Sequence, residues 1–246
     1  MFIVRWHKGM TVAALAVVAV VTILFTGLPA AGAYVCPSCY GLQKVTETLY
    51  VDQHATAKEI SDLKAEVALA NQRVATFFPE RLRTPKVFAC VTDACDQRLG
   101  GQQDTNGSHA LGGAFGDSFI HISSGGHNAT IVAHELTHIE FQARLGSLVM
   151  ARGAVPVWFG EGLAVIVARD MRHLGLSGPG RLVCNDPRSD ALPITRSAWS
   201  READLQERPI YAMAACRVLE WMPTQGQGAA IERLATTLRK GGAFPR

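Results

Sequence analysis

Residues 127–146 read HNATIVAHELTHIEFQARLG and carry the start and stop signals of a helix. Asn128 is typical of a helix N-cap, and Gly146 is typical of the residue that follows a helix. We therefore expect a helix over residues 129–145. The pattern H-E-x-x-H, at residues 134–138, lies in the middle of this helix. The stretch thus predicts a central helix that carries two histidines one turn apart.

Residues four apart on a helix lie on the same face, so His134 and His138 can point two imidazoles at one zinc ion. Glu135 is offset by one position, where it can take a proton from a zinc-bound water without being a ligand. Two histidines without this glutamate would describe a structural metal site equally well. Because a five-residue match can also arise by chance, a third ligand should be present, and Glu161 in the segment WFGEGLA is the best candidate.

An H-E-x-x-H helix followed by W-F-x-E-G-L-A resembles the gluzincin peptidases, the superfamily that contains thermolysin and many zinc aminopeptidases. The resemblance is specific over residues 131–168 and weaker as far as residue 222. It implies a zincin-like domain that cleaves a peptide or protein substrate. Carried over by position, it implies one Zn²⁺ per chain and the following site: ligands His134, His138 and Glu161, and general base Glu135.

The sequence departs from related patterns at several positions. The metzincin extension is absent, because Phe141 and Arg144 occupy its positions. Gluzincins often place an aspartate one turn after the glutamate ligand, but position 165 is Val. The nearest acid is Asp170, which either orients a histidine or, as we favour, finishes a helix beside its arginine neighbours. Asp170 as the third ligand is a weaker alternative, because it lacks the motif.

Peptide hydrolysis creates an oxyanion that a Tyr or His donor usually helps to stabilise. Tyr211 resembles the gluzincin aminopeptidase tyrosine on a helix after the zinc helices, although a tyrosine packed at a helix start is an equal alternative. Three histidines are rival donors, each more commonly a surface or capping residue: His109, His121 and His127.

The segment around residues 117–124, DSFIHISS, alternates like a strand with one exposed face. In gluzincins an extended substrate pairs with the edge strand beside the metal helix, and this segment occupies that place in the chain order. Trp158 and Phe159 are expected to be core residues that anchor the second helix. Asp117 is only a guess as a group that binds a substrate N-terminus.

The N-terminus has the features of an export signal, with basic residues before an apolar stretch. Ala31-Gly32-Ala33 fits a signal-peptidase site, whereas residues 11–28 are nearly long enough to span a bilayer as an uncleaved anchor. Residues 1–33 are therefore a signal peptide or a membrane anchor. The rest of the chain, residues 34–246, is expected in the periplasm or another extracytoplasmic compartment.

The six cysteines are an even number, as expected for disulfides in an exported chain. The simplest pairing is Cys36–Cys39, Cys90–Cys95 and Cys184–Cys216. A redox role for the CPSC segment is disfavoured, because it does not follow a strand of a βαβ unit. A second zinc site made by the first four cysteines stays as an alternative.

Thr56 and Glu59 form a predicted capping box at the start of an amphipathic helix. We expect strands at residues 48–52, 86–92 and 117–124, and helices at residues 56–78, 129–145, 156–175, 208–222 and 228–242. Residues 100–116 and 175–193 read as loops. This order predicts an α+β fold, with a small sheet, a metal-binding helix and a mostly helical C-terminal half.

The function expected from these features is zinc-dependent hydrolysis of peptide bonds, with Glu135 activating the attacking water. One alternative is an inactive, zinc-stabilised binding or chaperone-like envelope module, and another is a structural envelope protein without metal. We do not expect nucleic-acid binding, because the net charge is only +3 and the basic residues form no cluster in the sequence.

Overall fold

The computed structural model describes residues 29–101, 109–112, 118–178, 180–185, 190–223 and 225–245. The apolar segment 11–28 and Asp117 lie outside the described residues. Within these described ranges, no helix is long and apolar enough to cross a membrane. In chain order the elements are α2 (Pro29–Val35), η1 (Pro37–Tyr40), β1 (Leu42–Lys44), β2 (Leu49–Asp52), α3 (Ala57–Phe77), β3 (Lys86–Ala89), α4 (Asp93–Arg98), β4 (His109–Gly112), β5 (Ser118–Ile122), α5 (Ala129–Leu145), α6 (Ser147–Ala151), α7 (Val157–Ala168), β6 (Leu174–Ser177), β7 (Arg181–Cys184), α8 (Arg196–Leu205), α9 (Ile210–Trp221) and α10 (Gln227–Arg239).

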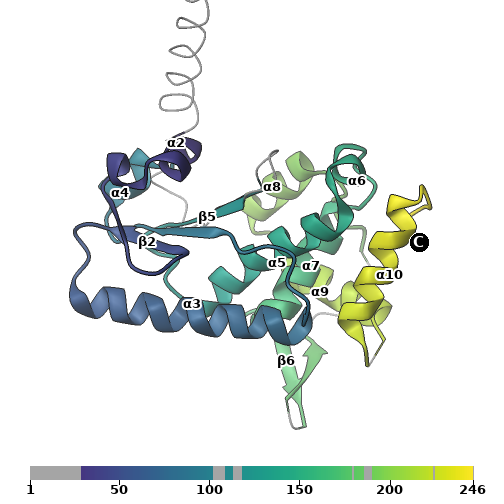
Figure 1. Ribbon diagram of the computed structural model, residues 1–246. Coiled ribbons are helices and arrows are strands. Elements are labelled where there is room, and N and C mark those ends of the chain that lie inside the picture. Colours follow the sequence, from purple (N-terminus) through teal and green to yellow (C-terminus); the bar gives the residue numbers. More distant parts are fainter. Residues whose placement is uncertain are drawn as a thin grey trace, which may run out of the picture.

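A five-stranded mixed sheet in the order β1-β2-β3-β5-β4 forms one half of the α+β fold. The three central strands are parallel, and β1 and β4 pair antiparallel at the two edges. One face of the sheet packs its aliphatic side chains against α3 and α5. The other face packs aromatic side chains beneath α2 and α4. Figure 1 shows this layering, with α3 along one side of the sheet and α2 and α4 on the other.

Strand β5 differs from its prediction in two ways. Residues 119–123 are all buried, so the expectation of an exposed face is wrong. The strand pairs with β3 on one side and β4 on the other, so the expectation of an edge strand is wrong too. The physical reason is the second helical layer, because α4 covers the face on which the polar residue His121 lies and supplies Asp96 as its partner.

The long helices begin and end as their local signals predict. At the start of α3, Thr56 Oγ1 accepts a hydrogen bond from the Glu59 N–H, and the Glu59 carboxylate accepts one from the Thr56 N–H. At the start of α5, Asn128 Oδ1 accepts a hydrogen bond from the Ile131 N–H at 2.9 Å. Gly146, with φ of 79°, follows the last residue of α5. Both capping predictions are confirmed.

Helix α7 is shorter than the predicted helix at residues 156–175. It ends at Ala168, because Arg169 adopts the left-handed conformation and Asp170 then accepts a hydrogen bond from the Arg172 N–H in a turn. The chain continues into β6 and β7, which form an antiparallel hairpin where residues 175–193 were predicted to be a loop. The predicted Gly-rich loop at residues 100–116 likewise contains β4.

The disulfides are the three that the sequence predicted, Cys36–Cys39, Cys90–Cys95 and Cys184–Cys216. The last one ties β7 to α9. Because the first four cysteines form two disulfides and offer no thiolate, the alternative of a cysteine zinc site is wrong. Three disulfides are consistent with an oxidising, extracytoplasmic compartment.

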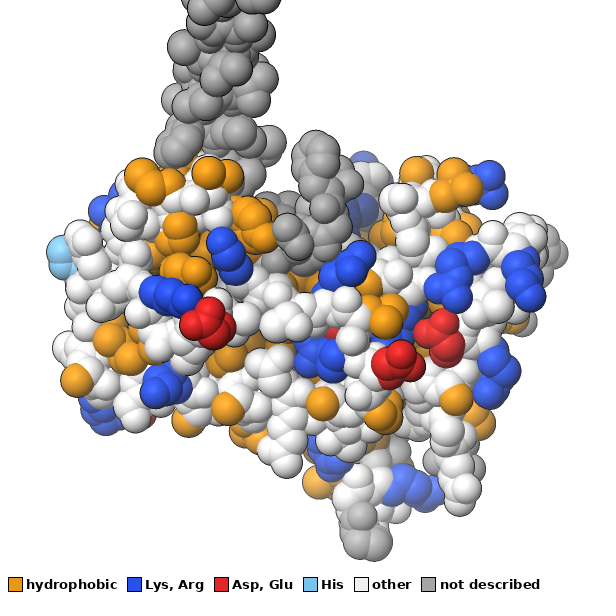
Figure 2. Space-filling model, viewed as in Figure 1, with side chains coloured by type: hydrophobic (Ala, Val, Ile, Leu, Met, Phe, Trp, Pro, Cys, Tyr) orange, Lys and Arg blue, Asp and Glu red, His pale blue; other side chains and the backbone are white. Residues whose placement is uncertain are grey.

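Basic residues are distributed over the surface in the view of Figure 2. On that face Lys and Arg side chains are interspersed with hydrophobic and uncharged ones, and no continuous basic stripe crosses it. This distribution agrees with the small net charge of +3.

Candidate metal centre

Helices α5 and α7 bring the three predicted ligands together. The Nε2 atoms of His134 and His138 are 3.1 Å apart. The Oε2 atom of Glu161 lies 3.3 Å from the first of these nitrogens and 3.5 Å from the second. Glu161 reaches them from the first half of α7, which packs directly against α5. The three donor atoms therefore form a nearly equilateral triangle.

This triangle has the size that a tetrahedral zinc site requires. Zinc binds imidazole nitrogen at about 2.0–2.1 Å, so the geometry of a tetrahedron places neighbouring ligand atoms about 3.3–3.4 Å apart. The observed distances of 3.1, 3.3 and 3.5 Å lie around this value. Two imidazoles and one carboxylate are also ligands that zinc accepts, and three protein ligands leave a fourth position for another group. The residues fit a metal ion.

The Glu161 side chain is buried, with 7% of the residue exposed. Burial alone would raise the pKa of its carboxyl, but the nearby His138 and His134 outweigh this effect and hold that pKa well below its usual range. Among the described residues, these two imidazoles are its hydrogen-bond and ion-pair partners. A buried, ionised carboxylate whose described partners are two imidazoles is suited to hold a cation.

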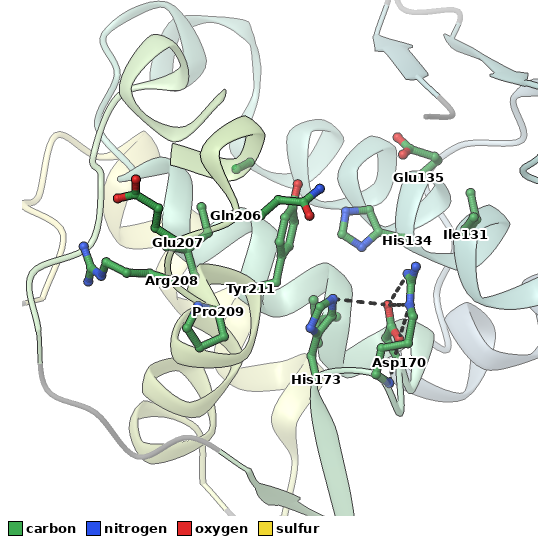
Figure 3. Close-up of a pocket in the computed structure, with 14 residues that line it drawn as sticks. Ile131, His134, Glu135, Asp170, His173, Gln206, Glu207, Arg208, Pro209 and Tyr211 are labelled. Carbon is green, nitrogen blue, oxygen red and sulfur yellow. Dashed lines mark hydrogen bonds and ion pairs between the residues drawn. The ribbon is translucent and has the colours of Figure 1, made fainter. Parts of the chain in front are cut away.

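A cavity of about 560 Å³ opens beside the triangle on the side of His134. Glu135 and Tyr211 both line this cavity. Figure 3 shows the Glu135 carboxylate and the hydroxyl end of Tyr211 to either side of His134, and the Tyr211 and His134 ring centroids are 6.4 Å apart. Burial, together with the charge of Glu161, raises the pKa of Tyr211. Its phenol therefore stays protonated at neutral pH and can donate a hydrogen bond.

His173 also lines this cavity, and the sequence gave no local signal for it. Its ring stacks on Tyr211, with centroids 5.4 Å apart and an interplanar angle of 19°. Burial lowers the pKa of His173, so its imidazole is neutral at neutral pH. The residue was predicted to be part of a long helix, whereas it lies in the turn after α7 that brings it to Tyr211.

Asp170 does not belong to the metal triangle, so the weaker alternative of Asp170 as a ligand is wrong. Its carboxylate pairs with the Arg172 guanidinium, at 2.6 Å between Oδ2 and Nη2. The contact with Arg172 agrees with the interpretation that we favoured, an acid beside an arginine neighbour just after a helix. Asp170 Oδ2 also lies 3.9 Å from His173 Nε2, as the dashed lines in Figure 3 show.

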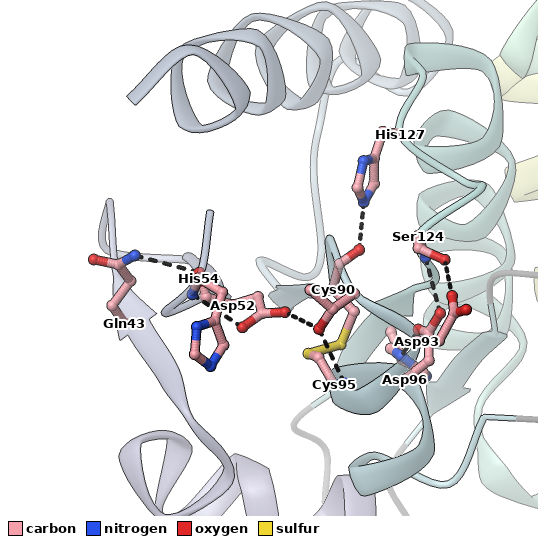
Figure 4. The surroundings of a disulfide bond; sticks show 11 residues. Gln43, Asp52, His54, Cys90, Asp93, Cys95, Asp96, Ser124 and His127 are labelled. Atoms are coloured by element: carbon pink, nitrogen blue, oxygen red, sulfur yellow. Dashed lines mark hydrogen bonds and ion pairs between the residues drawn. A yellow bond between two sulfur atoms is a disulfide. The ribbon is translucent and has the colours of Figure 1, made fainter. Parts of the chain in front are cut away.

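The rival histidines lie elsewhere. His127 Nε2 is 2.6 Å from the carbonyl oxygen of Cys90, and His121 Nε2 is 2.9 Å from Asp96 Oδ1. Neither residue lines the cavity beside the triangle. Figure 4 shows His127 and Asp96 around the Cys90–Cys95 disulfide. Cys90, Asp96 and His121 also lie close together, but the sulfur is in that disulfide and is no thiolate ligand. The side chain of His109 lies outside the described residues.

Trp158 and Phe159 are core residues, as predicted. Phe159 is completely buried, and the half-buried Trp158 packs against the same core. Their position at the start of α7 anchors the helix that carries Glu161.

The chain matches no protein-family model, no curated protein and no solved structure.

Proposed function

We propose that this protein is an extracytoplasmic, zinc-dependent peptidase with a zincin-like fold. The observation that carries the proposal is the triangle of His134, His138 and Glu161, whose spacing suits one zinc ion. Glu135 and Tyr211 line a cavity that opens on this triangle, which is where a general base and a hydrogen-bond donor are needed. These are the residues that the gluzincin resemblance assigns to the same roles.

A bound zinc ion would supply Lewis-acid activation of water and of the scissile carbonyl. Glu135 accepts the proton that the attacking water loses and delivers it to the nitrogen of the leaving amine. Tyr211, protonated at neutral pH, donates a hydrogen bond to the oxygen that becomes negatively charged. His173 stacks on the Tyr211 ring and restricts its orientation.

The sheet offers a place for an extended substrate, but at β4 and not at β5. Among the described strands, β4 pairs on one side only, and it also contacts the metal-binding helix α5. A peptide that adds to this edge would form backbone hydrogen bonds that are largely independent of its sequence. The substrate-binding strand of the proposal is therefore β4.

The test is Glu135→Gln, with Glu47→Gln as a matched control at an exposed position. We expect one zinc per chain in the wild type and both variants, measured by elemental analysis. We expect cleavage of denatured protein substrates to fall by about 10²–10⁴ in Glu135→Gln, because general acid–base catalysis contributes that much. Glu47→Gln should cleave like the wild type, because its side chain is 92% exposed in an ion pair with Lys44.

Two outcomes would replace the proposal with one of its alternatives. Stoichiometric zinc without turnover by the wild type, and an unchanged Glu135→Gln phenotype, would indicate a zinc-stabilised binding or chaperone-like module. Zinc well below one per chain would indicate a structural envelope protein.

A further inference from the structure

The two glycines on either side of Glu161 have different surroundings. A Cβ atom added to Gly162 would collide with the backbone carbonyl of Ala214 on α9. Gly162 therefore allows α7 and α9 to pack closely. A Cβ atom added to Gly160 would meet no atom within 4 Å. Packing explains the first glycine and not the second.

Backbone conformation does not explain Gly160 either. It lies inside α7 and is not among the glycines with positive φ. Glycine within a helix costs about 0.5–1 kcal/mol relative to alanine. An alanine at position 160 would fit the space and stabilise the helix. The fold therefore does not require the open space beside Gly160.

This space belongs to a second cavity, of about 80 Å³, which reaches the metal triangle past His138 and Glu161. The 560 Å³ cavity reaches the triangle past His134 and Glu135, so the two cavities approach it from different sides. Much of the lining of the small cavity is apolar, and these members come from α5, α6, the segment before α7 and the first residue of α7: Phe141, Leu145, Val149, Val155 and Val157. Gln142 of α5 and Arg196 of α8 add polar groups to the lining.

We propose, on the basis of the proposed peptidase function, that Gly160 keeps open a subsite for one small aliphatic side chain of the substrate, beside the scissile bond. A cavity of 150 Å³ lined by apolar side chains accommodates benzene. The present cavity of 80 Å³ has about half that volume, so it suits an alanine or valine side chain better than an aromatic ring.

Gly160→Leu tests the subsite, because the new side chain would fill the cavity from a backbone position that has room for it. Ala203→Leu is the matched control, because Ala203 lines the 560 Å³ cavity on the other side. Cleavage sites are mapped on a peptide library for the wild type and both variants. In the wild type we expect alanine or valine at one position next to the cleaved bond, and no aromatic residue there. Gly160→Leu should shift this position to glycine, while Ala203→Leu should retain it.

A second measurement does not depend on turnover. The affinities of dipeptide hydroxamates that carry glycine, valine or phenylalanine are measured by calorimetry on zinc-loaded protein. We expect the wild type to bind the valine compound most tightly. Gly160→Leu should lose at least tenfold in the valine-to-glycine affinity ratio, because a few carbon atoms in a pocket change selectivity by about 10–200-fold.

The outcomes separate this inference from the function on which it rests. A wild-type protein that cleaves no peptide overturns the peptidase, and the hydroxamate ratios still decide the subsite. A peptidase whose side-chain preference is the same in wild type and Gly160→Leu overturns the subsite alone. Zinc content and melting temperature are measured on each variant. If Gly160→Leu fails to fold, Gly160→Ala replaces it, and its expected shift is from valine towards alanine and glycine.

Discussion

Two buried glutamates, Glu140 on α5 and Glu161 on α7, differ in what surrounds them. Glu140 is completely buried on α5. Its carboxylate accepts hydrogen bonds from Arg81 Nε at 2.7 Å, from the N–H groups of Leu82 and Arg83 at 3.0 Å, and from Arg144. Glu161 is 7% exposed, and among the described residues its partners are two imidazoles.

The difference distinguishes a structural carboxylate from a candidate metal ligand. Burial raises the pKa of Glu140, but Arg81, the Leu82 N–H, Arg144 and the Arg83 N–H together outweigh this effect and keep it below its usual range. This carboxylate is fully compensated within the protein, and it ties residues 81–83 to α5. Among the described residues, Glu161 forms no ion pair with a Lys or Arg side chain. A buried carboxylate of this kind is suited to hold a cation.

The largest expected effect on stability is at Glu140, the carboxylate whose charge is compensated by arginines. Glu140→Gln should lower the free energy of unfolding by about 3–5 kcal/mol, because it leaves two buried arginine contacts without their anion. Urea unfolding at pH 7 measures the loss. The control is Glu47→Gln, which should stay within about 0.5 kcal/mol of the wild type. A loss below 1 kcal/mol for Glu140→Gln would contradict the structural role.

The difference in stability between the wild type and Glu140→Gln should depend on pH. Because folding lowers the pKa of Glu140, its charge stabilises the protein above the ordinary glutamate pKa of about 4.3, and this contribution is lost as the pH falls through the lower folded value. The stability gap between wild type and Glu140→Gln should therefore be constant from pH 7 to about pH 5 and narrow below about pH 4. Unfolding curves across this range measure it. A gap that widens towards acid would show that the sign is wrong.

Zinc should stabilise the protein through the other carboxylate. At a free zinc concentration of 100 times Kd, the free energy of unfolding should rise by about 2.7 kcal/mol, because only the folded chain holds the three ligands together. Thermal unfolding with zinc and after chelation measures the shift. His138→Ala is the control and should lose it. An equal shift in that variant would place the zinc elsewhere.

The smallest effect is expected for Glu161→Gln without metal. In chelator-treated protein its stability should fall by only about 1 kcal/mol, because the substitution weakens two imidazole contacts, not the arginine and backbone contacts that Glu140 makes, and the new amide oxygen can still accept a hydrogen bond from an imidazole. Chemical unfolding of both apo proteins tests this. A loss as large as that of Glu140→Gln would remove the distinction between the two glutamates.

The residues of the centre could be predicted because their signals are local. The capping residues Thr56 and Asn128 fix helix starts through hydrogen bonds three residues away, and both are present. His134 and His138 share a face through helix periodicity alone. The prediction of Glu161 depended on a motif in a second segment, and the packing of α7 on α5 brings this residue to the histidines.

Other features depend on residues far apart in the sequence and were missed. The alternation in residues 117–124 was interpreted as a strand with one solvent-exposed face. This local pattern contains no information about α4 and α2, which cover that face as a second layer. The hairpin of β6 and β7 was predicted as a loop, because its strands are short and flank a Gly-rich turn. His173 reaches Tyr211 only because α7 stops at Ala168.

The sequence by itself indicated the helices around the centre and the three candidate ligand residues, because these follow from periodicity and motif, and it offered the observed cysteine pairing as the simplest of several. Only the tertiary structure decided that β4 and not β5 is the edge strand near α5, that Tyr211 and His173 stack beside His134, and that Glu140 is compensated while Glu161 is not. It also showed that close packing requires a glycine at position 162 but not at position 160. These facts depend on which surfaces meet when distant segments pack, and no local pattern encodes that.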